Sequence, residues 1–566
     1  MDLGTTLDAA LAASLERWRD HDGVGQLWRR DASLWTDADE AEWLGWLALA
    51  DAPFDVAGTA ALSDQLRDEG VTALLLLGMG GSSLAPEVLS RVLGATPGWP
   101  TLHVLDSTDP GQVRRVEAKL DLSRTLCIVS SKSGTTLEPT LLAEYFIERV
   151  ERVVGPERVG SRFIAITDPG SALESLARER RFRATWPGIA AVGGRFSALS
   201  NFGLVPAALT GVDVVALLSR SRAMREWCGA DVRPDMNPGV RMGLVLGLAA
   251  TQGRDKVTFI LPPALEALAG WLEQLLAEST GKAGRGVIPV AGEAFDAPER
   301  YGDDRLFVVM RLAGAPGPDP ASVDRLIRAG HPVVELTLED PLDVGAEFFR
   351  WEVATAVCGA VLGVNPFDQP DVEASKVETR ELADAYERGR ALPVETPLAR
   401  DGRLALFGDP ATGALLHEQA GPDAGLRQLL AAHLGRVRPG DYLALLAYID
   451  MSRANQAVLQ RIRHAVREWR AVATSVGFGP RFLHSTGQAF KGGPDSGVFL
   501  QITCDDARDV AIPGRRYTFG VVKAAQALGD FRVLTHRRRR ALRVHVAGDV
   551  EAGLEGLERI VQTCLV

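Results

Sequence analysis

Cysteine is scarce in this sequence of 566 residues, and the few cysteines are scattered. The five of them, Cys127, Cys228, Cys358, Cys504 and Cys564, are odd in number, and no two form a C-x-x-C pair. A disulfide framework needs paired cysteines and a zinc knuckle needs closely spaced ones, so neither class is indicated. The pattern is typical of a protein in a reducing compartment, and we expect a cytoplasmic location.

Long hydrophobic runs are also missing. The longest apolar stretches, 73–77 and 242–250, are well short of the ~20 residues that cross a bilayer. The first residues carry Asp2, Asp8 and Glu16 among apolar positions, which predicts an amphipathic helix and not an export signal. We therefore expect no membrane partner.

Positive charge is not in excess. Lys and Arg number 62 against 73 Asp and Glu, which leaves a formal net charge of −11. Such a surface repels polyanions unless a local basic patch overrides it. The cluster THRRRR (535–540) leaves phosphate or RNA binding open, but the alternation that follows it favours the solvent face of a strand. We expect no nucleic-acid partner.

Metal-binding spacings are missing as well. None of the nine histidines forms an H-x-x-x-H pair or stands at ligand spacing from a cysteine. A metal-dependent hydride-shift enzyme would need such ligands. We expect no metal and no cofactor.

The residues that are present predict an α/β fold. Apolar runs at 73–78, 102–107, 126–131 and 163–168 alternate with helical patterns, and a second series follows at 257–262, 305–312 and 332–338. Near-continuous apolar strands separated by helices are typical of parallel sheets covered on both faces. At roughly 100–200 residues per domain, the chain is long enough for three to four domain-sized units.

Changes in pattern along the chain predict its domain boundaries. We expect an N-terminal helical extension (1–60), a first α/β domain (61–210), a second α/β domain (211–380), a linker or insert rich in Pro, Gly and Asp (381–440), and a C-terminal α/β region (441–566).

Two loops carry the signs of a phosphate site. GMGGSSLAP follows the run 73–78 and places Gly81 and Ser82 at the start of a helix, where free N–H groups attract an anion. SSKSGTT supplies Ser131, Lys132, Ser133 and Thr136 at the end of a neighbouring strand. Ligands of parallel sheets bind at this edge. A tight turn and an ordinary N-capping cluster are the alternatives.

These two loops resemble the paired loops of the sugar-isomerase domain. Three later segments, VGGRFSALSNFG (192–203), QLLAESTGK (274–282) and GVNPFDQPDVEASK (363–376), narrow the resemblance to the glucose-6-phosphate isomerase family. The resemblance covers residues from about 70 to about 380. It implies two flavodoxin-like sugar-isomerase domains and the interconversion of glucose 6-phosphate and fructose 6-phosphate.

Such an isomerase moves a proton between C1 and C2 of an open-chain sugar, so it needs a carboxylate base. Glu278 is the candidate, and Gln274 lies four residues earlier on the same helix face, where its amide can hold the ligand. The enediolate that forms needs a fixed cation, for which Arg195 is the candidate. The resemblance assigns these same roles. A solvated glutamate and a structural salt bridge are the alternatives.

The ring must open before the proton moves, which requires a proton donor and an acceptor. The resemblance assigns ring opening to Lys376 and phosphate contact to Gln369. It also indicates His484 in FLHSTGQAFKGG, but this segment follows NPFDQP by about 115 residues, whereas the family order places it before NPFDQP. A core or capping histidine is the alternative, and His331 is a weaker candidate for the role.

The altered order predicts that the C-terminal region completes or extends the second sugar-isomerase domain. It resembles the isomerase half of bifunctional transaldolase/glucose-6-phosphate isomerases, but this chain lacks the N-terminal barrel of such a fusion, so isomerase activity alone is expected. The resemblance implies a homodimer, because the histidine usually comes from the partner subunit. The position of His484 leaves that sharing open.

Two other functions remain as alternatives. A non-catalytic sugar-phosphate sensor would keep the phosphate loops without a base, an arginine and a lysine in matching places. An isomerase that also accepts mannose 6-phosphate has the same motifs, because the two sugars differ only at C2.

Overall fold

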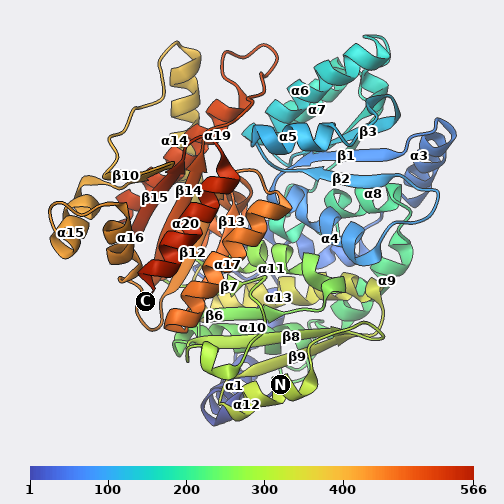
Figure 1. Ribbon diagram of the computed structural model, residues 1–566. Coiled ribbons are helices and arrows are strands. Elements are labelled where there is room, and N and C mark those ends of the chain that lie inside the picture. Colours follow the sequence, from blue (N-terminus) through green and yellow to red (C-terminus); the bar gives the residue numbers. More distant parts are fainter. Residues whose placement is uncertain (566) are drawn as a thin grey trace.

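The computed structural model describes residues 1–565. Within this range the chain forms three largely parallel β-sheets with helices packed on them (Figure 1). The α/β fold with parallel sheets is therefore confirmed. Within the described range no helix is both long and apolar enough to span a bilayer.

The first sheet has the strand order β2-β1-β3-β4-β5, and all its strands are parallel. Its strands are β1 (Ala73–Gly78), β2 (Thr101–Leu105), β3 (Thr125–Ser130), β4 (Phe163–Thr167) and β5 (Ala184–Pro187). Its helices are α3 (Val56–Asp68), α4 (Leu84–Leu93), α5 (Pro110–Glu117), α6 (Leu137–Val154), α7 (Ala172–Glu179) and α8 (Asn201–Leu209). Every residue of β1 and β3 is buried, which explains their continuous apolar sequences.

The second sheet has the order β7-β6-β8-β9 and is also parallel. Its strands are β6 (Lys256–Ile260), β7 (Ile288–Val290), β8 (Arg305–Leu312) and β9 (Val333–Leu338). The helices of this part are α9 (Val214–Trp227), α10 (Pro238–Thr251), α11 (Glu266–Thr280), α12 (Pro320–Arg328), α13 (Val344–Leu362) and α14 (Pro370–Glu387). A large hydrophobic cluster unites α10, α11 and α13 with α4 of the first part.

The N-terminal residues pack against the second sheet. They form the expected amphipathic helix, α1 (Gly4–Asp20), followed by α2 (Gly23–Trp28). Leu7 and Leu11 of α1 are buried in the large cluster, and Asp2 forms a β-bridge with Val333.

The third sheet lies in the C-terminal part and has the order β10-β11-β15-β14-β12-β13 (left in Figure 1). Its strands are β10 (Ala399–Asp401), β11 (Leu404–Phe407), β12 (Tyr442–Tyr448), β13 (Ala473–Phe478), β14 (Gly497–Cys504) and β15 (Arg540–Val546). Its helices are α15 (Pro410–Ala420), α16 (Leu426–Leu434), α17 (Arg453–Arg470), α18 (Gly487–Gly492), α19 (Phe519–His536) and α20 (Val550–Cys564). The segment 381–440 thus contributes two antiparallel edge strands and two helices to this part.

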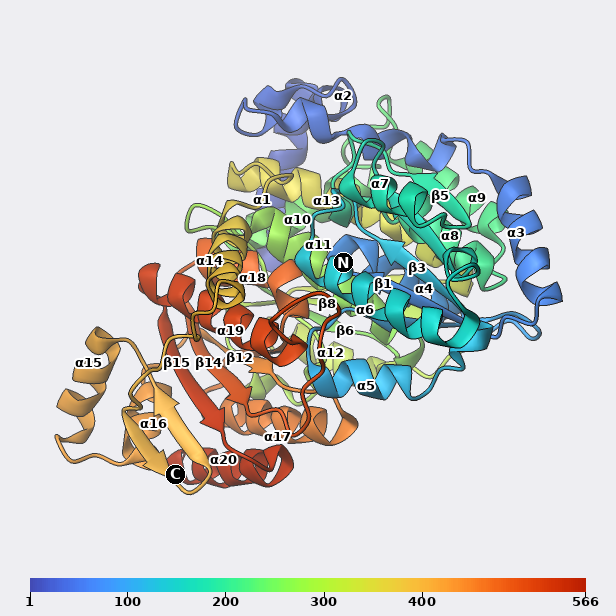
Figure 2. The ribbon, with the colours of Figure 1, turned by 90° about the horizontal axis from the view of Figure 1, so that it is seen from above.

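The C-terminal region extends the second unit by packing and not by adding strands to its sheet. Apolar side chains of α11 and β7, among them Ala277 and Ile288, form one cluster with Tyr442, Phe482 and Phe490 of the C-terminal part. The edge strand β7 is only three residues long, so it offers few backbone groups for a further ladder. Separate sheets with a shared hydrophobic interface are the result (Figure 2).

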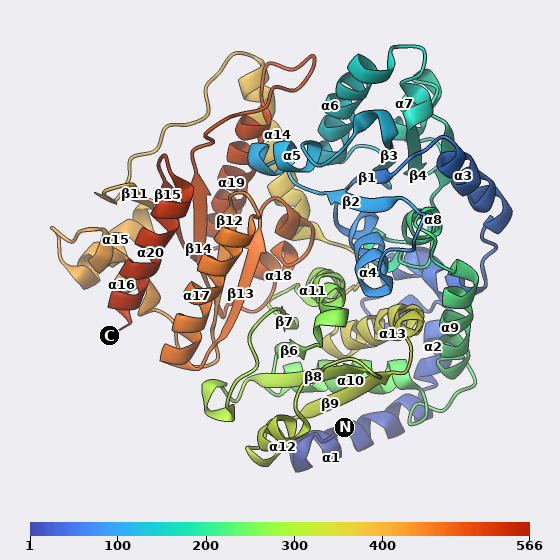
Figure 3. The same ribbon diagram turned by 45° about the vertical axis from the view of Figure 1, so that its right-hand side comes forward.

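The three parts meet at one place. The loops after β1 and β3 leave the same edge of the first sheet, because Gly78 pairs with Ser130 at the ends of these strands. Helices α11 and α18 lie side by side between the three sheets (Figure 3), and α14 packs against α18 and α19. This junction brings the candidate residues of all three parts together.

Candidate active site

The loop after β1 packs tightly on the segment that carries Arg195. A Cβ atom on Gly81 would overlap the carbonyl oxygen of Gly194, so only glycine allows this approach. Gly80 has φ +53°, and a Cβ there would lie 2.6 Å from Nε2 of Gln274 and 3.2 Å from Cβ of His484. The glycines of GMGG, with the buried Ser82 after them, therefore form a floor on which the arginine, the glutamine and the histidine converge.

The loop after β3 lines a cavity of about 270 Å³ with Ser133, Thr135 and Thr136. Lys376 and His484 line the same cavity. Thr136 directly precedes α6, so free backbone N–H groups of that helix start lie at the cavity. Hydroxyls, helix N–H groups and an ammonium are suited to a phosphate.

Two other residues predicted for this loop lie elsewhere. Ser131 lines a neighbouring cavity on the side of α6 and α7. The ammonium of Lys132 forms an ion pair with Asp168 and lies 3.2 Å from the carbonyl oxygen of Ile189. The structure thus brings Ser133 and Thr136 to the cavity of Lys376 and His484, and it directs Lys132 to the adjacent strand end.

A buried carboxylate holds the histidine. Nε2 of His484 lies 3.1 Å from Oε1 of Glu138, which also accepts a hydrogen bond of 2.6 Å from Nε2 of Gln526. Burial alone raises the pKa of the Glu138 carboxyl, but the His484 imidazole, a backbone N–H and Lys376 outweigh it and hold this pKa below its ordinary value. Glu138 is therefore ionised at neutral pH and orients the imidazole.

Sequence reasoning missed this carboxylate. Glu138 stands two residues after Thr136 in SKSGTTLEP, so its position inside a phosphate motif was the available signal. Gln526 comes from α19 and also accepts a hydrogen bond of 2.6 Å from the hydroxyl of Thr108. No local pattern marks Gln526 or Thr108, because their contact joins residues far apart in the chain.

Gln274 and Glu278 lie on one face of α11. Nε2 of Gln274 donates a hydrogen bond of 3.0 Å to Oε2 of Glu278. Oε1 of Gln274 is buried and has no hydrogen-bond partner among residues 1–565. This free acceptor next to the carboxylate is suited to a ligand hydroxyl.

Arg195 is the best-anchored side chain of the site. Nε donates to the hydroxyl of Ser279 at 2.8 Å, Nη1 donates to Oε1 of Gln369 at 2.9 Å, and Nη2 donates to the carbonyl oxygens of Pro366 and Asp368 at 2.9 Å each. The remaining N–H group belongs to Nη1, which lies 3.6 Å from Oε1 of Glu278. Burial lowers the pKa of Arg195, and the carboxylates of Glu278 and Asp368 oppose that shift.

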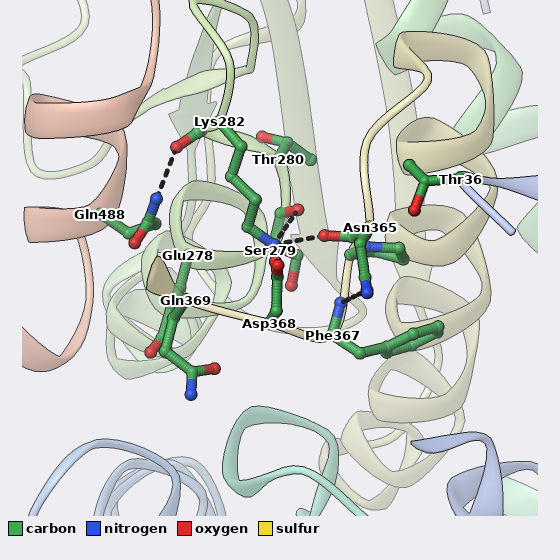
Figure 4. A network of polar contacts seen from close by, with 12 residues as sticks. Thr36, Glu278, Ser279, Thr280, Lys282, Asn365, Phe367, Asp368, Gln369 and Gln488 are labelled. Atoms are coloured by element: carbon green, nitrogen blue, oxygen red, sulfur yellow. Dashed lines mark hydrogen bonds and ion pairs between the residues drawn. The ribbon is translucent and has the colours of Figure 1, made fainter. Parts of the chain in front are cut away.

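A second buried cation supports the segment that carries Gln369 (Figure 4). The ammonium of Lys282 lies 2.7 Å from Oδ1 of Asp368 and 3.1 Å from the carbonyl oxygen of Ser279, and it also donates to the carbonyl oxygen of Asn365. Burial, together with the Arg195 guanidinium, lowers the pKa of Lys282 to about 7. Lys282 thus ties the end of α11 to the turn before α14.

His331 lies outside this arrangement. Its ring packs edge-on against Phe307 and Tyr301 at the start of β9. Burial lowers the pKa of His331. It does not line the cavity of Lys376 and His484. Among residues 1–565 there is no cluster of three or more His, Cys, Asp or Glu side chains suited to a metal ion.

Comparison with known proteins identifies the family of the chain. Residues 66–288 match the family model for phosphoglucose isomerase. A glucose-6-phosphate isomerase from Rubrobacter xylanophilus is 30% identical over 365 residues, a match that covers 56% of this chain and 83% of the relative. The chain belongs to the glucose-6-phosphate isomerase family. A probable glucose-6-phosphate isomerase from Natronomonas pharaonis is 32% identical over 352 residues, covering 55% of this chain and 78% of the relative.

Two solved structures share the fold. A hypothetical protein from Thermus thermophilus matches with a TM-score of 0.58 and 26% identity, covering 67% of this chain and 98% of that protein. A glucose-6-phosphate isomerase from Chlamydia trachomatis matches with a TM-score of 0.50 and 20% identity, covering 64% and 78% of the two chains. The further likeness to the isomerase half of transaldolase fusions stays a prediction.

Proposed function

We propose that this chain is a glucose-6-phosphate isomerase that interconverts glucose 6-phosphate and fructose 6-phosphate. The observation that carries the proposal is the position of the Glu278 carboxylate, 3.6 Å from the one uncommitted N–H group of Arg195. A carboxylate base next to a fixed cation is what an enediolate intermediate requires. Membership of the family supports the choice of substrate.

The phosphate of the sugar binds in the cavity of the second loop. Ser133, Thr135 and Thr136 offer hydroxyls, and the start of α6 offers backbone N–H groups and its positive dipole end. This grip holds the far end of the substrate and leaves its C1 and C2 to the other residues. Gly81 lies on the other loop, which packs against the segment of Arg195.

Ring opening belongs to His484 and Lys376, which line the same cavity. One group gives a proton to the ring oxygen while the other accepts the proton of the C1 hydroxyl, so the C1–O5 bond breaks and the aldehyde forms. Glu138 keeps the imidazole oriented for this transfer. No net proton is gained or lost.

Isomerisation belongs to Glu278. Its carboxylate takes the proton from C2 of the open aldose and returns it to C1, while a hydroxyl proton moves from O2 to O1. The free N–H group of Arg195 stabilises the enediolate, and the free Oε1 of Gln274 accepts a substrate hydroxyl. Gln369 bonds to Arg195 and keeps that guanidinium in place.

We also propose a cytoplasmic homodimer, with each site completed inside one subunit. The contact between His484 and Glu138 of the same chain supports a site completed inside one subunit. The family resemblance supports the dimer, and the five free cysteines support the location. The family arrangement in which the histidine crosses to a partner is the alternative.

A coupled assay that converts fructose 6-phosphate to glucose 6-phosphate tests the function. Glu278→Gln should lower kcat by roughly 1,000-fold or more and leave substrate binding intact, because it removes only the base. Glu273→Gln on the same helix is the matched control. Burial raises the pKa of Glu273 to about 7, so the substitution resembles its protonated form and should leave kcat unchanged.

Two outcomes point to the alternatives. Binding of sugar phosphates by the parent protein without turnover would overturn the proposal in favour of a sensor. Turnover of mannose 6-phosphate in the same assay would assign the broader substrate range.

A further inference from the structure

Gln488 is a buried amide four residues after His484, in the first turn of α18. Its Oε1 accepts hydrogen bonds from the backbone N–H groups of Asp371, at 2.9 Å, and Val372, at 3.1 Å. Its Nε2 donates to the carbonyl oxygen of Gly281, at 3.0 Å, and to Oδ2 of Asp371, at 2.7 Å. Both lone pairs and both N–H groups of the amide are thus engaged.

The oxygen of Gln488 serves as the N-terminal cap of α14. The first N–H groups of a helix need acceptors from outside the helix. The residue in the N-cap position is Gln369, but its side-chain oxygen accepts from Nη1 of Arg195 and is committed to the site. Gln488 takes over the capping role and accepts from the N–H group of Asp371, which lies 117 positions earlier in the chain.

The nitrogen of Gln488 reaches the helix of the base. Gly281 is the C-cap residue of α11, three positions after Glu278. Asp371, the other acceptor, also forms an ion pair of 2.5 Å with Arg537. One side chain therefore joins the segment of His484, the helix of Lys376 and the helix of Glu278.

We propose that Gln488 is a positioning residue that sets His484 and Lys376 in register with Glu278. The inference rests on the proposed isomerase function. Ring opening and the isomerisation that follows it use groups from three separate segments, which must be aligned with the substrate. A shift of about 1 Å in one of these groups can lower the rate about 100-fold. Gln488 touches neither the cavity of the phosphate loop nor the reacting atoms, so it acts through the groups that it holds.

Gln488→Glu is the first test. The carboxylate keeps the acceptor for α14, but it loses the donor to Gly281 and lies against the carboxylate of Asp371. We expect kcat with fructose 6-phosphate to fall roughly 10- to 100-fold. The KM should change less than about threefold, because the loop of Ser133 and Thr136 is untouched.

A second substitution should restore activity. In the double variant Gln488→Glu with Asp371→Asn, the amide at 371 donates to the carboxylate at 488, which removes the repulsion and rebuilds one hydrogen bond. We expect most of the lost kcat to return. A loss caused by general instability would grow with the second substitution.

Gln501→Glu is the matched control. Gln501 is buried on β14 of the same part, and its Nε2 bonds to the carbonyl oxygen of Ala527 at 3.0 Å and to Oδ2 of Asp530 at 3.3 Å. This variant places a carboxylate next to an aspartate as Gln488→Glu does, but Gln501 bonds to neither α11 nor α14 and does not line the cavity of Lys376 and His484. It should lower the melting temperature by a similar amount and retain the parent kcat.

A double-mutant cycle tests how Gln488 acts. If Gln488 works through His484 and Lys376, then Gln488→Glu should add less than about twofold to the loss in the background of His484→Ala with Lys376→Ala. If the two losses multiply, or if Gln488→Glu retains the parent kcat, the inference is overturned. Should Gln488→Glu fail to fold, Gln488→Asn takes its place, since it keeps the amide and shortens its reach by one methylene. An inactive parent protein would instead overturn the proposed function itself.

Discussion

Nε2 of His484 lies 3.1 Å from Oε1 of Glu138, although 346 positions separate the two residues in the chain. The histidine comes from the C-terminal part and the glutamate from the first turn of α6 in the first part. The displaced histidine segment therefore reaches the phosphate loop of its own chain. The proposal that each site is completed inside one subunit can therefore be tested by kinetic experiments.

Mixing two inactive variants shows whether subunits share the site. Glu278→Gln and His484→Ala each disable one residue, and if the chain is the proposed homodimer, unfolding and refolding the two together should give mixed dimers. With a site inside each chain, every site carries one lesion, so we expect no activity above that of the separate variants. The coupled assay on refolded mixtures measures this, with refolded parent as the control. Recovered turnover in the mixture would mean that His484 acts across the dimer.

Glu138→Gln should slow turnover without weakening binding. The amide keeps the shape of the side chain but lacks the negative charge that orients and stabilises the imidazole, so we expect kcat to fall roughly 10- to 100-fold. Steady-state kinetics with fructose 6-phosphate provide the measurement. Glu144→Gln is the control, because Glu144 lies on the same helix and pairs with Arg515 at the surface. Equal kcat values for the two variants would contradict a role for Glu138 in turnover.

Arg195→Lys should lower kcat by roughly 100- to 1,000-fold, because an ammonium cannot make the several directed bonds of the guanidinium and still reach the enediolate. Arg183→Lys is the control, since Arg183 pairs with Glu69 on the surface and should retain activity. Steady-state kinetics with fructose 6-phosphate give the kcat of both variants for comparison. A loss of less than about tenfold in Arg195→Lys would contradict a role in stabilising the intermediate.

Glu352→Met should stabilise the protein at neutral and alkaline pH. Glu352 is buried in α13, neither of its oxygens has a partner among the described residues, and burial raises its pKa well above the ordinary value. A raised pKa in the folded state means that stability present below about pH 4 is lost as the pH rises toward the folded pKa. We expect the variant to gain about 1–3 kcal/mol in free energy of unfolding at pH 8.

Urea denaturation at pH 5 and pH 8 measures this difference, which should be larger at pH 8. Glu555→Met, at an exposed position of α20, should change stability by less than about 0.5 kcal/mol at either pH. A lower free energy of unfolding for Glu352→Met than for the parent at pH 8 would contradict this prediction.

Local patterns predicted much of the fold. The apolar run 73–78 became β1 with the same bounds, and the run 305–312 became β8, because continuous burial on both faces leaves a direct record in the sequence. The spacing of Gln274 and Glu278 predicted their shared helix face, since the helix period alone sets it. The short strand β7 left no such record, because three residues carry no recognisable period.

The site residues that stand in dense motifs were predicted. Those that meet other residues only across the fold were missed. Arg195, Glu278, Lys376 and His484 were all named from motifs, and the structure brings them to one junction of the three parts. Gln526 was missed, because an isolated glutamine has no local signature, and Gln488 was missed although it stands in FLHSTGQAFKGG, because its partners Asp371 and Gly281 lie far away in the chain. Ser131 and Lys132 were placed at the cavity from their motif, but the turn of the loop directs them elsewhere.

Helix and strand periods and capping residues act over a few positions, so local sequence sets which elements form and which chemical groups the chain can offer. The separate C-terminal sheet, and the contact that it brings about between His484 and Glu138 of the same chain, follow from tertiary packing. Burial of apolar surface between α11, β7 and the C-terminal strands sets the docking of the parts. That energy depends on surfaces assembled from distant segments.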